Sequence, residues 1–192
     1  MELNSNVLFF DRVENEIYFN KNGKIIDSAS TIKSKVGKYF INEKKYEFKE
    51  NVIVENPDYK IRSNMMDYFL SSEVTLFYEY STIMTDDYTI FCNEGFYDPQ
   101  KKIGVFKKNA KVNSDSKTIF GDSIFFDENK KYASASGNIK IIDEKENLII
   151  KGDYAEVFEE LDSALITKNP MAINITKTDS LFVKADTLIS LG

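Results

Sequence analysis

The chain has 192 residues, of which 42% are hydrophobic and 29% charged, with 25 basic and 31 acidic side chains and a net charge of −6. This is the composition of a folded globular protein rather than of a disordered one. The two signs of charge are interspersed and form no basic stripe, which argues against nucleic acid as a partner. No apolar run reaches the ~18 residues that a membrane-spanning helix needs.

The residue types argue against catalysis and metal binding. The chain has no histidine, which is the commonest general base and a common metal ligand. The single cysteine, Cys92, allows neither an internal disulfide framework nor a multi-cysteine metal site. We therefore expect no enzyme, no metal site and no cofactor.

Strand-like segments with alternating apolar residues follow one another along the chain, beginning at residues 6–11. Six segments share one pattern, with spacings of 29 residues that grow to 31 and 33 at the end: 32–44, 61–73, 90–102, 119–131, 150–162 and 183–192. The unit around 104–126 predicts two strands, 104–112 and 117–126, with a polar turn between them. Residues 154–161 have some helical propensity, but their phase with the other units favours a strand.

Four columns of similar residues run through these units. The first is β-branched: Ile32, Ile61, Ile90, Ile119, Ile150 and Val183. Two residues later comes a small residue: Ser34, Ser63, Cys92, Gly121, Gly152 and Ala185. A polar residue follows directly: Lys35, Asn64, Asn93, Asp122, Asp153 and Asp186.

The fourth column lies upstream and is asparagine with one exception: Asn22, Asn51, Tyr80, Asn109, Asn138 and Asn169. Asparagine tolerates left-handed backbone, so this column predicts a bend or bulge between two strands. The small column predicts a point where a neighbouring group approaches closely.

A unit of about 29 residues cannot bury its own apolar face, so each unit must stack on its neighbours. The segment 6–11 has the pattern of the tail of a further unit, and the chain ends in a strand-like run. We therefore expect open strand edges at both ends, available for pairing with another chain, and a chain that is one segment of a longer protein.

Four segments, 36–63, 92–112, 121–141 and 152–167, resemble the OstA-like proteins of Bacteroidota-type bacteria, in the superfamily of LptA and the N-terminal domain of LptD. The recurring small–Asp step and the turn Gly137-Asn138-Ile139 carry the resemblance. It implies an all-β fold, a repetitive antiparallel β-jellyroll forming an open, twisted trough, with residues 1–192 as one domain. It also implies a non-enzymatic periplasmic protein, whose signal peptide lies outside the chain because residues 1–6 do not have that pattern.

The resemblance further implies lipopolysaccharide or lipid A as cargo, edge-to-edge stacking with other β-jellyroll transport proteins, and head-to-tail homo-oligomers as an option. The side chains that we predict to line an apolar interior are Ile61, Ile90, Ile119, Ile150, Phe48, Phe77, Phe106 and Ile141. The alternative interpretation of the same residues is a closed core inside a structural scaffold or filament that carries no lipid.

Three further sets of residues have simpler interpretations. Asp122, Asp153 and Asp186 suit backbone-capping groups better than calcium ligands. Cys92 suits a packed small residue better than a nucleophile. The lysine pairs at 101–102, 107–108 and 130–131 suit a solvated rim better than phosphate ligands. A β-helical polysaccharide enzyme is disfavoured, because its coils are shorter and no acidic–basic cluster appears.

Overall fold

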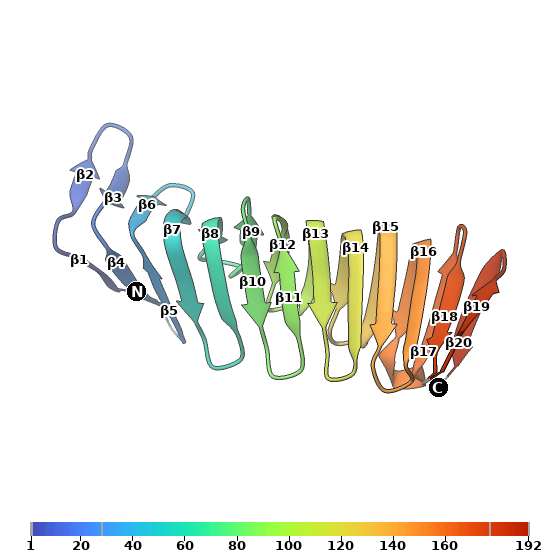
Figure 1. Cartoon of the computed structure of the whole chain (residues 1–192). Helices are drawn as coiled ribbons and strands as arrows, with labels where there is room; N and C mark the ends of the chain where they lie inside the picture. Colours follow the sequence, from blue (N-terminus) through green and yellow to red (C-terminus); the bar gives the residue numbers. More distant parts are fainter. Residues whose placement is uncertain (1, 28, 177, 192) are drawn as a thin grey trace. The chain divides into compact units, whose positions relative to one another are not determined.

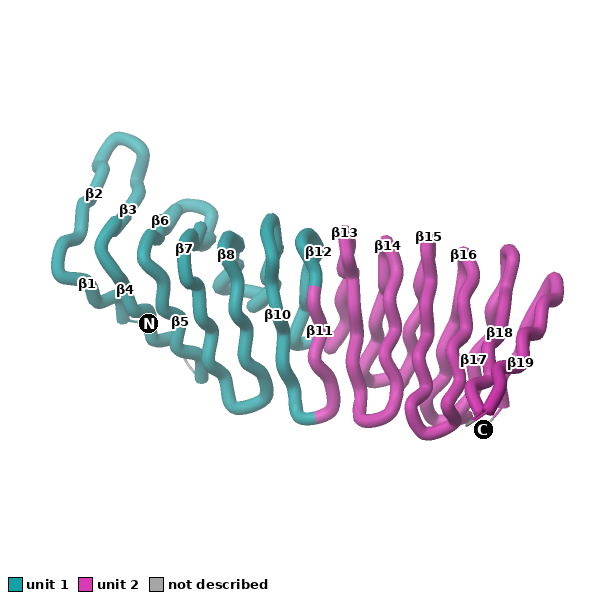
Figure 2. The backbone as a smooth tube through the Cα atoms, viewed as in Figure 1, with its two compact units in different colours: residues 1–86, 92–100 teal, residues 87–91, 101–192 magenta. Residues whose placement is uncertain are grey.

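The computed structural model describes residues 2–27, 29–176 and 178–191, and almost every regular element in them is a β-strand (Figure 1). The exception is one 3₁₀ turn, Glu159–Leu161. The chain divides into two compact units, which are residues 1–86 with 92–100 and residues 87–91 with 101–192 (Figure 2). All the strand pairings within each unit are antiparallel, so the all-β antiparallel fold expected from the sequence is confirmed.

Unit 1 contains two ladders of hydrogen-bonded strands that share their longest members, β7 (Lys45–Glu55) and β8 (Lys60–Phe69). Ladder A of this unit adds five strands: β2 (Phe9–Asp11), β3 (Glu16–Phe19), β6 (Val36–Phe40), β9 (Thr75–Phe77) and β12 (Glu94–Asp98). Ladder B adds four: β1 (Glu2–Ser5), β4 (Gly23–Asp27), β5 (Ser30–Ser34) and β10 (Ser81–Met84).

Unit 2 repeats this arrangement with four shared strands: β13 (Ile103–Asn113), β14 (Lys117–Asp127), β15 (Tyr132–Asp143) and β16 (Leu148–Phe158). Its ladder A continues through β17 (Ser163–Thr167) to β20 (Thr187–Leu191). Its ladder B runs from β11 (Thr89–Cys92) through the shared strands to β18 (Met171–Ile175) and β19 (Ser180–Lys184). Residues 154–158 are strand and 159–161 the 3₁₀ turn, so the strand prediction for 154–161 is confirmed except at its end.

The asparagine column marks where a long strand passes from one ladder to the other. The strand register breaks between Lys107 and Ala110 in β13, and Lys108 and Asn109 both have positive φ, 57° and 64°. The same pair of left-handed residues recurs at Glu50–Asn51, Gly137–Asn138 and Lys168–Asn169, whereas Tyr80, the exception in the column, has no positive φ. The bend predicted from asparagine is therefore confirmed.

The small column is constrained by packing at Gly152. A Cβ added there would lie 2.6 Å from Cγ2 of Ile166, whereas one added at Gly121 would lie at an ordinary 3.4 Å from Cβ of Ala135. Close approach is thus real at Gly152 but not at Gly121, and the column as a whole reflects a limit on size rather than one shared contact.

Inward side chains of the two ladders meet and form the core. In unit 2, Ile119 and Val112 of ladder B lie around the same small cavity as Phe126, Ala133 and Val157 of ladder A. Large side chains that are completely buried include Tyr46, Tyr68, Phe48, Phe77 and Phe106. The core therefore lies between the ladders, and the outward side chains of both ladders face solvent.

Candidate functional site

All eight side chains predicted to line an apolar interior are buried, with at most 7% exposure for Ile119. The structure groups them by unit: Phe48, Ile61 and Phe77 in unit 1, and Ile90, Phe106, Ile119, Ile141 and Ile150 in unit 2. Burial is expected both of a filled core and of a lipid-lined interior, so the space beside these residues decides what they can do.

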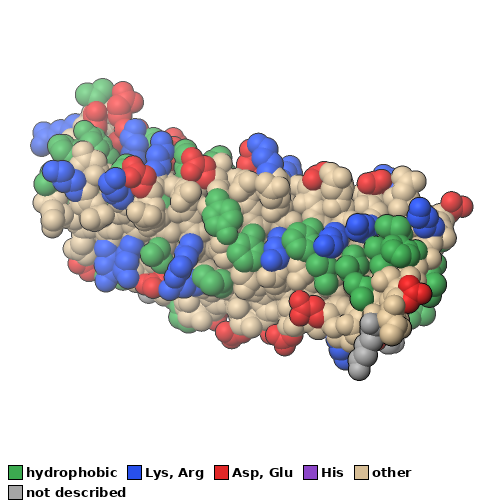
Figure 3. All heavy atoms as spheres, in the orientation of Figure 1, with side chains coloured by type: hydrophobic (Ala, Val, Ile, Leu, Met, Phe, Trp, Pro, Cys, Tyr) green, Lys and Arg blue, Asp and Glu red, His purple; other side chains and the backbone are tan. Residues whose placement is uncertain are grey.

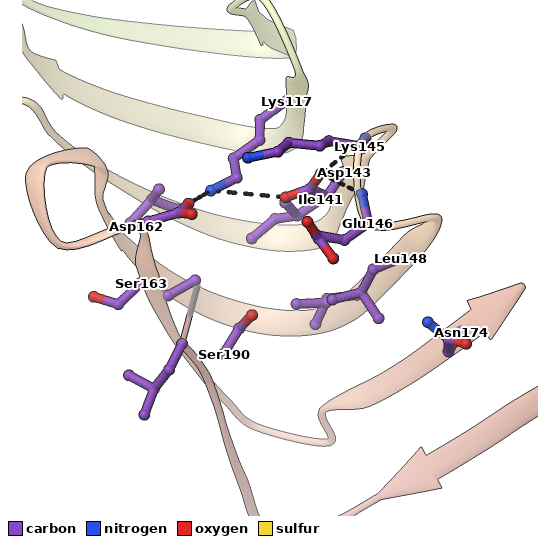
Figure 4. Close-up of a pocket in the computed structure, with 14 residues that line it drawn as sticks. Lys117, Ile141, Asp143, Lys145, Glu146, Leu148, Asp162, Ser163, Asn174 and Ser190 are labelled. Carbon is purple, nitrogen blue, oxygen red and sulfur yellow. Dashed lines mark hydrogen bonds and ion pairs between the residues drawn. The ribbon is translucent and has the colours of Figure 1, made fainter.

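A cavity of about 350 Å³ opens in unit 2 where the ladders diverge beyond β16 (Figure 4). Its walls come from β15, β16 and β18 on one side and from β16, β17 and β20 on the other. The apolar lining consists of Ile141, Leu148, Ile150, Val157, Ala164 and Leu191. Two of the residues predicted to line an apolar interior, Ile141 and Ile150, thus line this cavity.

Charged side chains form the rim of this cavity. The Lys117 ammonium hydrogen-bonds to Asp162 and lies 3.7 Å from Oδ2 of Asp143 (Figure 4). The hydrogen bond and the charge of Lys117 lower the pKa of Asp162. Oδ1 of Asp143 accepts the backbone N–H groups of Lys145 and Glu146, each at 3.1 Å. The rim is therefore polar and ordered by its own contacts, and the rest of the lining combines apolar side chains with Ser163, Asn174 and Ser190.

The interior next to this cavity is filled. The space around Ile119 measures about 10 Å³, which is at the lower limit of the ~10–15 Å³ that one buried water molecule needs. Tyr88 covers it from the turn between β10 and β11, with its ring 4.6 Å from that of Phe126 and its hydroxyl donating to Glu159. Burial, followed by this hydrogen bond, raises the pKa of Tyr88. The two ladders are thus in contact at this level.

An ion pair reinforces the contact at Tyr88. The Lys131 ammonium lies 3.3 Å from Oδ2 of Asp87 and donates to the Tyr88 hydroxyl at 3.3 Å. These contacts hold Tyr88 against the side of unit 2 formed by Phe126 and Glu159.

Asp122, Asp153 and Cys92, which the sequence also singled out, make structural contacts. Asp122 accepts a hydrogen bond from Nδ2 of Asn138 at 2.8 Å, and Asp153 accepts one from Asn169 at 3.4 Å. Over the described residues, no group of three potential metal ligands comes together. Burial raises the pKa of Cys92 to about 12, which leaves the thiol protonated at neutral pH.

Members of two of the three lysine pairs form ion pairs at the protein surface. Lys102 lies 3.0 Å from Glu128, and Lys130 lies 3.2 Å from Asp127. The charged rim of the cavity was not predicted, because Lys117 begins β14, Asp143 ends β15 and Asp162 follows the 3₁₀ turn, so the three are far apart in the sequence. Their only signal was the recurrence of charged residues at strand ends.

The family model described as "OstA-like protein" matches residues 1–64. A similar solved structure is LptH from Pseudomonas aeruginosa, described as the LptA homologous periplasmic component of the conserved lipopolysaccharide transport device. It has 9% identity and a TM-score of 0.31 over 80% of this chain and 93% of that chain. No curated protein matches the chain.

The part of the chain that the structure describes contains no helix with the length and hydrophobicity of a membrane span. The similarity to OstA-like proteins that the sequence indicated is confirmed over residues 1–64.

Proposed function

We propose that the chain is a component of a periplasmic lipopolysaccharide-transport bridge that holds the acyl chains of lipid A between its ladders. Residues 1–64 match the OstA-like family, and the asparagine and small columns continue in the same phase through the rest of the chain. This continuity supports assigning residues 1–192 to one β-jellyroll domain.

The observation that carries the proposal is the cavity of about 350 Å³, in which a group of apolar side chains lies beside charged and polar ones. Each acyl methylene removed from water gains about 0.8 kcal/mol, so an apolar lining suits an acyl chain. A rim holding Lys117, Lys145 and several carboxylates suits the polar part of an amphiphile. The cavity size falls at the lower end of small-molecule sites, which span about 300–1,000 Å³, and so fits part of an acyl chain.

Photo-crosslinking at neighbouring positions of β16 tests this proposal. Val157 points into the cavity, whereas Glu156 lies on the outer face and accepts hydrogen bonds from Tyr132 and Tyr154. A photoreactive phenylalanine at residue 150 or 157 should label purified lipopolysaccharide, and one at 156 should not. Equal labelling at inner and outer positions, or none at all, would show that the interior does not hold lipid.

The second candidate is a structural scaffold with a closed core. The filled interior around Ile119 and the contact of Tyr88 with Phe126 and Glu159 favour it. This function predicts concentration-dependent self-association without lipopolysaccharide labelling, so the crosslinking experiment separates the two candidates.

End-to-end stacking is supported by the outermost strands. Within the described residues, β1 and β2 of unit 1 and β19 and β20 of unit 2 each pair on one side only. Ile189 of β20 is 66% exposed. A charge at an edge strand opposes pairing with another chain, so Ile189→Lys should lower self-association in sedimentation velocity, whereas Lys107→Gln, far from the edge in sequence, should not. If both variants self-associate as strongly as the parent chain, the edge strand β20 does not mediate end-to-end stacking.

A further inference from the structure

The outer face of ladder B in unit 2 carries a row of cations and large side chains assembled from separate repeats. Strand pairing places seven residues side by side, one from each strand: Phe91, Lys111, Phe120, Lys140, Lys151, Met171 and Lys184. Their sequence neighbours Ile119, Ile141 and Ile150 are buried. Because side chains alternate along a strand, the row points outward.

The lysines of this row are available to a partner. The Lys111 ammonium lies 5.2 Å from the ring centre of Phe91 and 5.4 Å from that of Phe120, and Lys140 lies 5.9 Å from Phe120. None of the row's lysines forms an ion pair with a carboxylate among the residues that the structure describes. The carboxylates two residues beyond Phe120 and Lys151 are those hydrogen-bonded to Asn138 and Asn169.

A second row, apolar except at its first position, runs parallel to the first. Pairing aligns Thr118, Ile142, Ile149, Ile173 and Phe182. The two rows are two residues apart along each strand, which corresponds to about 7 Å. Phe182 is 61% exposed, and the three isoleucines are partly exposed. Figure 3 shows lysines in a line with hydrophobic side chains between and beside them over this part of the molecule.

A cationic row beside an apolar row matches one kind of partner better than others. Lysines at the level of anionic headgroups, with aromatic and aliphatic groups reaching toward the acyl boundary, are the pattern of proteins that lie on a bilayer surface. A soluble acidic chain would engage the lysines but leave the isoleucine row in water. The net charge of −6 for the whole chain shows that this cationic surface is local.

We propose that the outer face of ladder B in unit 2, defined by these two rows, docks on a lipid bilayer that displays anionic headgroups. The docking surface is separate from the interior cavity and does not depend on what that cavity holds. A Phe or Lys on this face lies on the opposite side of the sheet from Ile119 and Ile150.

Vesicle binding by the full chain tests the charge requirement. The chain should bind vesicles of two parts phosphatidylcholine to one part phosphatidylglycerol, should not bind pure phosphatidylcholine, and should dissociate as salt rises. Lys140→Gln with Lys151→Gln should lower partitioning about 25-fold, at about fivefold for each lysine near an anionic surface. The matched control, Lys107→Gln with Lys130→Gln, removes the same charge from other positions and should change partitioning less than twofold.

The apolar row is tested by Ile149→Ser and by a depth reporter. Ile149→Ser should also weaken vesicle binding while circular dichroism stays unchanged. The chain has no tryptophan, so Phe120→Trp provides a single tryptophan, whose fluorescence brominated acyl chains should quench. Tyr132→Trp, on the outer face of ladder A, should not be quenched. Both positions point away from the interior, so lipid taken up there would quench neither.

Four results would overturn the proposal. Binding that is equal for neutral and anionic vesicles removes the role of the lysines, and so does an equal loss in the control pair. Equal quenching of Phe120→Trp and Tyr132→Trp removes the specific face. If dextran sulfate displaces the chain from the anionic vesicles and Ile149→Ser does not weaken vesicle binding, the row binds a soluble polyanion instead of a bilayer.

Discussion

Two glycines of the small column provide a matched test of how the ladders of unit 2 pack. Gly121 and Gly152 occupy the same place in consecutive repeats, and neither has a positive φ. An alanine at residue 152 would place its Cβ 2.6 Å from Cγ2 of the fully buried Ile166, whereas at residue 121 the nearest atoms lie at 3.4 Å. The same substitution should therefore have opposite effects at the two sites.

The expected magnitudes follow from these distances. Replacing glycine by alanine where the backbone allows it stabilises a protein by about 0.4–1 kcal/mol, because the unfolded chain loses freedom. Gly121→Ala should show this gain. Forcing an extra methyl into a filled core costs about 1–3 kcal/mol. Gly152→Ala also has the gain from a less flexible unfolded chain, so its free energy of unfolding should fall by about 1–2 kcal/mol in total. For a chain of this length, the two variants should differ in Tm by roughly 5 °C or more.

Urea unfolding followed by circular dichroism gives both free energies. In an Ile166→Ala background, the methyl that Gly152→Ala meets is absent, so the cost of Gly152→Ala should disappear in a double-mutant cycle. Ile166→Ala by itself should cost about 2–5 kcal/mol. If Gly152→Ala is as well tolerated as Gly121→Ala, or if its cost persists without the isoleucine, the packing described for β16 and β17 is incorrect.

Three further predictions concern the bend, the thiol and the cavity rim. Asn138→Ala, at φ 50°, should lower the free energy of unfolding by about 1–2 kcal/mol because alanine disfavours left-handed backbone and the bond to Asp122 is lost; Asn138→Gly should be milder in the same urea titration. Burial raises the pKa of Cys92 to about 12 in the folded chain, against an ordinary 9.0. The contribution of the buried thiol to stability is therefore full below pH 9 and is lost as pH rises toward 12, and Cys92→Ala should remove this pH dependence. A folded chain whose thiol reacts with Ellman's reagent at pH 8 as fast as that of the unfolded chain would contradict this. Lys117→Met should cost less than about 1 kcal/mol in urea, because Asp162 is largely exposed, and a larger loss would mean that the rim pair stabilises the fold.

Much of the fold could be predicted because the residues that recur in each repeat constrain the local backbone conformation and the burial of side chains. The asparagine column forecast left-handed residues, and φ at Asn22, Asn51 and Asn109 is 53°, 56° and 64°. The β-branched column forecast buried positions, since alternating strands must place one set of side chains inside. These features are local, so one sequence is enough to predict them.

The surface features could not be predicted in the same way because they depend on strand register. Phe120 and Lys151 stand between the β-branched and small columns, and Lys111 and Lys140 stand two residues after an asparagine. They become one row only when adjacent strands pair. The interpretation that the chain has no basic stripe was therefore wrong for this surface, because interspersed lysines in the sequence become adjacent across strands.

The two-residue break at the asparagines of the long strands explains why alternation remained a valid guide across the bend. Lys108 and Asn109 separate the ladder A part of β13 from its ladder B part, yet Phe106 and Ala110 on either side are both buried. Ala135 and Ile139 flank the break in β15 in the same way. A shift of one residue would turn every side chain of one ladder to the opposite face. A break of two residues preserves the phase, so each strand keeps one face for the interior in both ladders and the other for the exterior, where the cationic row lies.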